Sequence, residues 1–161
     1  MTQTLRNAIR YWWPAAAWAG AIWIFSTDIF SAQSTSRWLF PALHWLMPKA
    51  SSAEILAAAE VVRKFAHVFE YFVLSLFVFR GIRGAQRGWR VSWALATVAL
   101  ILCYAALDEV HQAFVPSRRP SAFDVVLDVT GATIAQALLW FFLRRSRRAS
   151  EVHTHATQPA D

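Results

Sequence analysis

Four apolar stretches in this chain carry their ionisable side chains toward one end, and threading the chain through a bilayer brings those ends to the same side. The stretches cover residues 11–25, 65–79, 91–107 and 124–143. The length of 161 residues accommodates about four spans at roughly 20 residues each. Ionisable groups inside spanning segments are costly and usually mark functional sites. The pattern therefore predicts an all-α, multi-pass membrane protein with a polar site on one face.

The composition supports a membrane protein and argues against a nucleic-acid partner. Hydrophobic residues make up 57% of the chain, with 9 Trp and 12 Phe, which is more apolar surface than a soluble domain of this size needs. The net charge is +6. However, the arginines lie between the apolar stretches, where they act as topology signals instead of forming a basic patch. We therefore expect membrane lipids as partners and no nucleic acid.

The distribution of arginines predicts the orientation. Cytoplasmic segments are enriched in Lys and Arg. The richest segments precede the first stretch, separate the second from the third, and follow the fourth; they contain Arg6 and Arg10, Arg80 to Arg90, and Arg144 to Arg148. This distribution predicts four transmembrane helices with both termini cytoplasmic, in a plasma (inner) membrane.

The first outer connection contains its own helix signals. Residues 37–47 form a short apolar stretch that ends at Pro48 and is too short to span, so an interfacial helix is expected. Ser51 and Glu54 have capping-box spacing, although Ser52 could serve as the cap instead. From there helix formers continue to Phe79, which predicts a helix roughly 40 Å long.

The fourth helix has a start signal and a small-residue face. Pro120 breaks the chain, and Ser121 with Asp124 resembles a second capping box. Gly131 and Ala135 offer a face for close helix packing. We expect residues 1–148 to form the transmembrane domain and the polar residues 149–161 to form a disordered cytoplasmic tail.

Polar side chains from three helices are predicted to meet in a partly hydrated pocket open to the outside. At about 1.5 Å per residue from the inner arginines, His67 lies roughly 20 Å deep, Asp128 about 24 Å and Asp108 about 27 Å. Helical spacing also places them on inward-facing stripes. The candidate ligand-binding residues are Lys64, His67, Glu70, Tyr71, Asp108, Glu109, Gln112, Arg118, Ser121, Asp124 and Asp128.

Structural roles compete with this interpretation. Lys64 could form an ion pair with Asp108 or Asp128, and His67 could be a hydrogen-bonded core residue. Arg118 could hold the outer loop by pairing with Asp124, or bind lipid headgroups.

Two segments resemble the signatures of a known family. They read Arg63-Lys64-x-Ala66-His67-x-x-Glu70-Tyr71-x-x-Leu74 and Asp108-Glu109-x-x-Gln112-x-Phe114-x-Pro116-x-Arg118-x-x-Ser121-x-x-Asp124. Both resemble the VanZ-like family of small bacterial membrane proteins, as does Ser26-Thr27-Asp28 followed by Thr35-Ser36. The resemblance implies a cell-envelope protein, because the founding member is linked to low-level teicoplanin resistance. Asp128 departs from the Asn that the family often carries there.

Two classes of function fit these residues. The first is a binder or modulator of an anionic envelope or lipid-linked ligand. The second is a membrane-embedded enzyme acting on a lipid-linked substrate, with Glu109, Asp124 and His67 as acid–base candidates. A site for a hard cation built from carboxylates and histidines is disfavoured by the nearby charges of Lys64 and Arg118. We therefore expect no metal and no cofactor.

Overall fold

The computed structural model is entirely helical across the residues that it describes, which are 2–27, 32–116 and 121–156; only the backbone is described at 4, at 32–34 and from 145 onward. Five helices follow one another: α1 (Gln3–Phe25), α2 (Ala32–Leu46), α3 (Ser52–Arg83), α4 (Val91–Ala113) and α5 (Ala122–Ala156). No strand occurs within these ranges. The predicted all-α class is confirmed.

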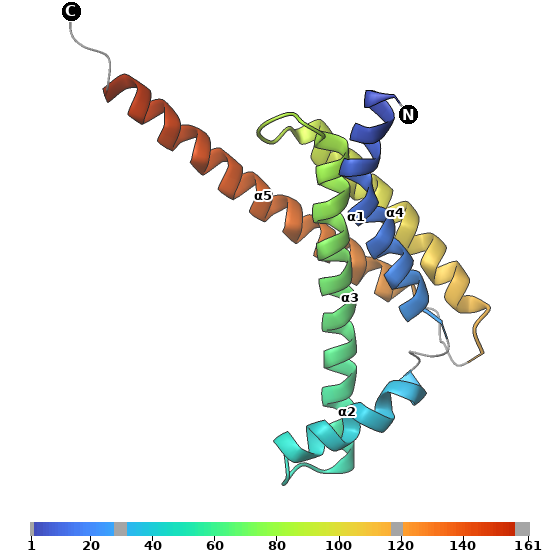
Figure 1. Cartoon of the computed structure of the whole chain (residues 1–161). Helices are drawn as coiled ribbons and strands as arrows, with labels where there is room; N and C mark the ends of the chain where they lie inside the picture. Colours follow the sequence, from blue (N-terminus) through green and yellow to red (C-terminus); the bar gives the residue numbers. More distant parts are fainter. Residues whose placement is uncertain (1, 28–31, 117–120, 157–161) are drawn as a thin grey trace, which may run out of the picture.

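Helix α3 is the centre of the arrangement. Helices α1, α4 and α5 all pack against it, and α4 also packs on α5 (Figure 1). Helix α5 crosses α3 obliquely, whereas α2 lies across the first turns of α3. The N-terminus, the turn between α3 and α4 and the later part of α5 lie toward one end of the molecule. The arginine-rich segments are therefore gathered at one end, opposite α2.

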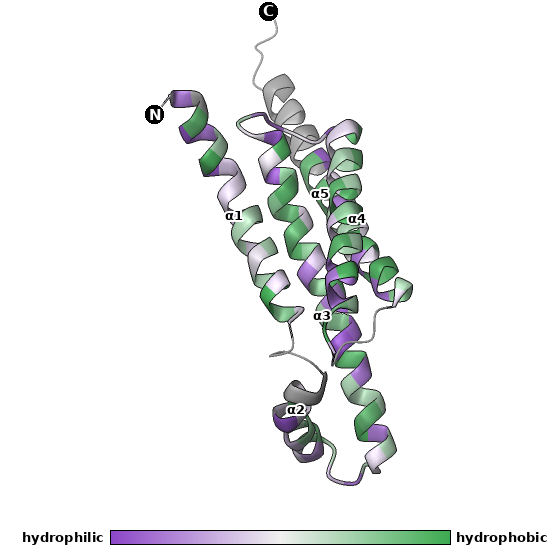
Figure 2. Ribbon diagram, turned by 90° about the vertical axis from the view of Figure 1, so that its right-hand side faces the viewer, coloured by the Kyte–Doolittle hydropathy of each residue, from purple (hydrophilic) through white to green (hydrophobic). Residues whose placement is uncertain are grey.

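Three helices are long and apolar enough to cross a membrane: Ser52–Arg83, Val91–Ala113 and Ala122–Arg144. Helix α1 is not among them, so the structure supports three of the four predicted spans. Its apolar stretch is rich in Trp and also contains Tyr11 and Pro14, and aromatic residues with a polar edge favour the membrane interface over the hydrocarbon core. Figure 2 shows the apolar residues covering α4, α5 and the later part of α3.

The start of α3 follows the predicted capping box. The Ser51 hydroxyl accepts a hydrogen bond from the Glu54 amide at 3.4 Å, and the Glu54 carboxylate accepts one from the Ser51 amide at 2.7 Å. Ser51, and not Ser52, is the cap. With 32 residues, α3 is about 48 Å long and exceeds the hydrocarbon thickness of about 30 Å.

Two helices extend further than the sequence predicted. Helix α2 begins at Ala32 instead of Arg37 and continues through Pro41. Helix α5 reaches Ala156, so the first part of the tail that was expected to be disordered is helical. No glycine or proline lies between Gly131 and Pro159 to end α5, which explains its length.

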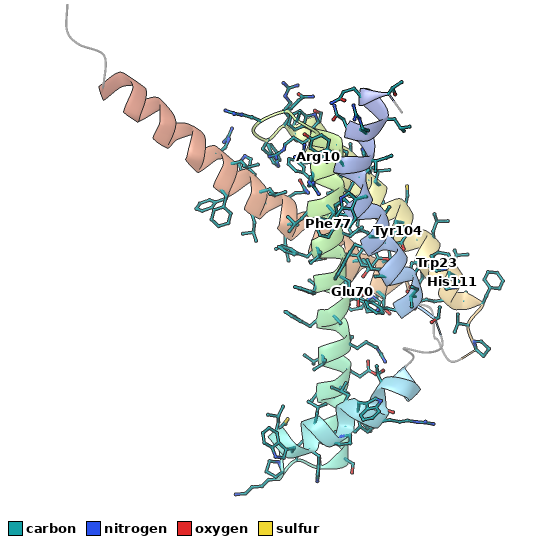
Figure 3. The ribbon with its side chains drawn as sticks, in the orientation of Figure 1. Arg10, Trp23, Glu70, Phe77, Tyr104 and His111 are labelled. Atoms are coloured by element: carbon teal, nitrogen blue, oxygen red, sulfur yellow. The ribbon has the colours of Figure 1, made fainter. Side chains whose placement is uncertain are left out.

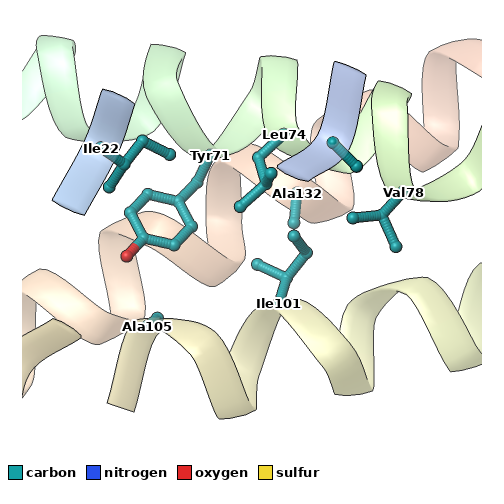
Figure 4. Close-up of a cluster of buried hydrophobic side chains, with 8 residues drawn as sticks. Ile22, Tyr71, Leu74, Val78, Ile101, Ala105 and Ala132 are labelled. Carbon is teal, nitrogen blue, oxygen red and sulfur yellow. The ribbon is translucent and has the colours of Figure 1, made fainter. Parts of the chain in front are cut away.

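Small residues allow α3 and α5 to approach closely. A Cβ added at Gly131 would collide with the carbonyl group of Val68, so the two backbones are in contact there. Ala132 and Ala135 are fully buried beside it. This confirms the predicted small-residue face. The neighbouring core contains Ile22, Tyr71, Leu74, Val78, Ile101, Ala105 and Ala132 (Figure 4).

Candidate functional site

A cavity of about 630 Å³ lies between α2 and the first half of α3, and we call it the α2–α3 cavity. The end of α1 closes one side, and Gln112 of α4 reaches it. Its apolar walls include Phe25, Leu39, Phe40, Leu56 and Val62. Its charged side chains and its histidine form a run along α3: Glu60, Arg63, His67 and Glu70. A cavity with apolar walls and a few convergent polar groups is typical of a small-molecule site.

His67 connects this cavity to α5. Its Nδ1 lies 3.2 Å from Oδ1 of Asp128. The Asp128 side chain is 3% exposed and that of His67 is 14% exposed. The pair is therefore shielded from water on the Asp128 side, while the His67 ring lines the cavity. A carboxylate that holds one ring nitrogen fixes both the orientation and the tautomer of an imidazole.

A second buried polar cluster ties α1 to α4. The Ser26 hydroxyl donates to Oδ2 of Asp108 at 2.7 Å, and Nε2 of Gln112 donates to the same oxygen at 2.9 Å. Asp108 is 2% exposed, and its Oδ1 has no hydrogen-bond partner among the described residues. Since Ser26 is the residue that ends α1, this cluster fixes the end of α1 that closes the cavity.

Aromatic contacts hold the surrounding helices. Tyr71 is fully buried, and its ring lies 6.2 Å from that of Tyr104, whose hydroxyl donates to the Ala19 carbonyl at 2.6 Å. His111 stacks on Trp23 with ring centroids 4.0 Å apart. Figure 3 shows this pair at about the level of Glu70. These residues pack α1 against α3 and α4.

Comparison with known sequences decides the family. The sequence model of the VanZ/LLP1 family matches residues 11–144. The chain belongs to the VanZ/LLP1 family. The matched range includes every residue that lines the α2–α3 cavity. No curated protein and no solved structure matches the chain.

The polar residues that were predicted to share one pocket do not all line it in this VanZ/LLP1 protein. His67, Glu70 and Gln112 line the α2–α3 cavity. Tyr71 and Asp108 lie in the buried core between helices instead. Arg118, the predicted anion-binding residue, lies outside the described residues, as does Asp28 of the first motif.

Lys64 is not paired with a buried acid. Its Nζ lies 5.4 Å from the centroid of the Phe123 ring, and it forms no ion pair with a described residue. Asp128 is bonded to His67, and Asp108 to Ser26 and Gln112. The ion pair that the sequence left open is therefore not formed, because Lys64 projects from the exposed face of α3.

Glu109 has a capping role that the sequence did not predict. The Ser121 amide donates to its Oε1, while the Ser121 hydroxyl accepts from the Phe123 amide at 3.2 Å. In a capping box, the first of these bonds would go to Asp124. Ser121 is therefore the cap of α5, but the carboxylate partner comes from α4. Asp124 is half-buried in the first turn of α5, and neither acid lines the α2–α3 cavity.

The sequence analysis missed the part that α2 plays in the site. Thr35, Ser36, Leu39 and Phe40 form the wall opposite α3. The Thr35-Ser36 pair was part of the family resemblance and was the available signal. Arg63, from the first signature, also lines the cavity and pairs with Glu60. Within the described residues, no group of three or more His, Cys, Asp or Glu could hold a metal ion.

Proposed function

We propose that this protein is a four-span integral protein of the bacterial plasma (inner) membrane, and that its α2–α3 cavity binds an anionic envelope or lipid-linked ligand from the outer leaflet. Masking or modulating such a ligand would connect the protein to glycopeptide resistance of the teicoplanin type. The observation that carries the proposal is the cavity itself. Its long apolar walls suit a hydrocarbon chain, and Arg63 and His67 suit a phosphate or carboxylate head.

The position of the cavity along α3 supports access from the outer leaflet. Counting from Arg80 at about 1.5 Å per residue, Glu70 lies about 15 Å and Glu60 about 30 Å from the inner boundary. The charged lining therefore extends from the membrane centre to its outer surface. Helix α2 would lie in the interface at that level. Its Trp38 and Trp45 are 83% and 80% exposed, as suits an interfacial helix.

Packing supports α1 as the fourth span. Its 23 residues extend about 35 Å, which is enough to cross the hydrocarbon core. One face is held in the bundle, where the Trp18 ring nitrogen donates to the Glu70 carbonyl at 2.9 Å. The other face leaves Trp13 and Ile24 exposed, as expected for side chains that meet lipid.

The orientation can be tested by cysteine labelling in a Cys103→Ala background. Lys49→Cys is expected to react with an impermeant thiol reagent in intact cells, because it precedes α3 on the proposed outer side. Arg87→Cys, in the turn between α3 and α4, is expected to react only after the cells are opened. Labelling of Arg87→Cys in intact cells would reverse the orientation and place the cavity on the cytoplasmic side.

Filling the cavity tests the ligand. Ala66 lines it, and Ala66→Trp is expected to lower the fraction of protein that retains a co-purified lipid by at least about tenfold. Ala57→Trp is the matched control, since Ala57 is exposed on the same helix but does not line the cavity. Native mass spectrometry in mild detergent gives the bound fraction. Equal retention by both variants, or no retained ligand in the unsubstituted protein, would contradict binding in this cavity.

A further inference from the structure

We propose that His67, oriented by Asp128, is the general acid–base residue for hydrolysis of a phosphate ester in an amphiphilic substrate held in the α2–α3 cavity. The protein would then be an enzyme that releases an alcohol and a phosphate from a lipid-linked ester. This inference rests on the proposed function, because the cavity must first hold the ligand.

The geometry of the pair is that of an oriented base. Nδ1 of His67 is 3.2 Å from Oδ1 of Asp128, and the Asp128 side chain is almost completely buried. The two nitrogens of an imidazole ring lie on different edges of the ring, so a ring bonded to Asp128 through Nδ1 keeps Nε2 for proton exchange. His67 lines the cavity, which makes Nε2 the group that can meet a substrate. The buried carboxylate also stabilises the imidazolium that forms during proton transfer.

Arg63 is placed to bind the phosphate. It precedes His67 by four residues, so both side chains lie on one face of α3, and both line the cavity. One Nη of Arg63 is paired with Glu60. A guanidinium carries five N–H donors, and those beyond this pair can bind phosphate oxygens. The Arg63 side chain is 39% exposed, so its guanidinium is accessible to a ligand that enters the cavity.

The reaction needs only water as a second substrate. Nε2 takes a proton from a water molecule as its oxygen forms a bond to phosphorus. The bond between phosphorus and the ester oxygen breaks on the side opposite the attacking water, and a second water molecule there gives its proton to the departing oxygen. The hydroxide that remains is neutralised by the proton that Nε2 releases. The ester and water become an alcohol and a phosphate, and His67 returns to its starting state. The N–H groups of Arg63 that are not bonded to Glu60 donate to the phosphate oxygens in the transition state.

A purely structural role for the same pair predicts a different outcome. If the pair only ties α3 to α5, removing it would lower stability without a specific effect on turnover. His67→Gln and Asp128→Asn keep a hydrogen bond between the helices, so both variants are expected to fold. His111→Gln is the matched control, because His111 is also half-buried but stacks on Trp23 outside the cavity.

The test compares lipids from cells that produce each full-length protein. Untargeted mass spectrometry of the membranes is expected to show one phosphate-ester lipid depleted and its alcohol enriched with the unsubstituted protein and with His111→Gln. His67→Gln is expected to slow this conversion by about 100-fold or more, and Asp128→Asn by at least about tenfold. Native mass spectrometry should show that both purified variants still retain the lipid.

The outcomes separate catalysis from binding. Lipid profiles that are the same with and without the protein would overturn the hydrolysis, and so would full turnover by His67→Gln. If His67→Gln does not accumulate, full turnover by Asp128→Asn overturns the role of the pair. Retention of the ligand by all variants without any conversion would leave the protein a binder. Absence of the ligand from purified His67→Gln and Asp128→Asn, as well as from the unsubstituted protein, would refute the proposed function as well.

Discussion

Gly131→Ala is expected to lower the free energy of unfolding by about 3 kcal/mol, at the upper end of the range for overpacked sites. The added methyl group would collide with the carbonyl group of Val68 and crowd the Phe72 amide. Both neighbours are backbone atoms of α3, so no side-chain rotation can relieve the clash. Helices α3 and α5 would have to separate, and the pairing of His67 with Asp128 would be weakened with them.

Gly20→Ala is the matched control for this prediction. A Cβ at Gly20 meets no atom within 4 Å, and alanine favours a helix over glycine by up to about 1 kcal/mol. The control is therefore expected to be neutral or slightly stabilising. SDS titration of the purified proteins, followed by far-ultraviolet circular dichroism, gives both free energies. Equal stability of the two variants would contradict the close contact of α3 and α5.

Asp108→Ala is expected to have an effect of similar size, a loss of about 3 kcal/mol in the free energy of unfolding. It would leave the Ser26 hydroxyl and the Gln112 amide without their buried acceptor, and each unsatisfied buried donor costs about 1–3 kcal/mol. The end of α1 would be released from α4. Because that end closes the α2–α3 cavity, ligand retention should fall as well.

Asp108→Asn removes the negative charge of this side chain and keeps an oxygen that can accept its hydrogen bonds. The amide oxygen can still accept from both donors, so a loss of no more than about 1 kcal/mol is expected. The same SDS titration measures both variants. A loss as large for Asn as for Ala would mean that the negative charge of Asp108, and not its role as an acceptor, holds the two helices together.

Local signals in the sequence predicted the start of α3 and the close-packed face. Ser51 and Glu54 are three residues apart, so their capping box depends on no distant contact. Gly131 and Ala135 repeat at helical spacing, and the small face follows from that spacing alone. The position of each side chain along its helix was also predictable in outline, because a helix rises by about 1.5 Å per residue.

Partners across helices were not predictable in the same way. Lys64 and His67 lie within one turn of each other on α3, so the sequence places both at about the level of Asp128. The contact at Gly131 fixes how α3 is rotated about its own axis. In that rotation His67, and not Lys64, faces Asp128. The bond between Glu109 and Ser121 depends on how α4 and α5 meet, and the cavity wall depends on how α2 lies across α3. A single sequence contains no direct signal for these placements.

The central claim, that the α2–α3 cavity holds a specific ligand, is tested most directly by photo-crosslinking in living membranes. Benzoylphenylalanine would replace Phe40, which lines the cavity, or Phe65, which is exposed on α3 outside it. The account predicts one dominant, saturable adduct at position 40 and a mixture matching the bulk lipids at position 65, as read by mass spectrometry. The same bulk-lipid mixture at both positions would contradict a specific ligand in the cavity.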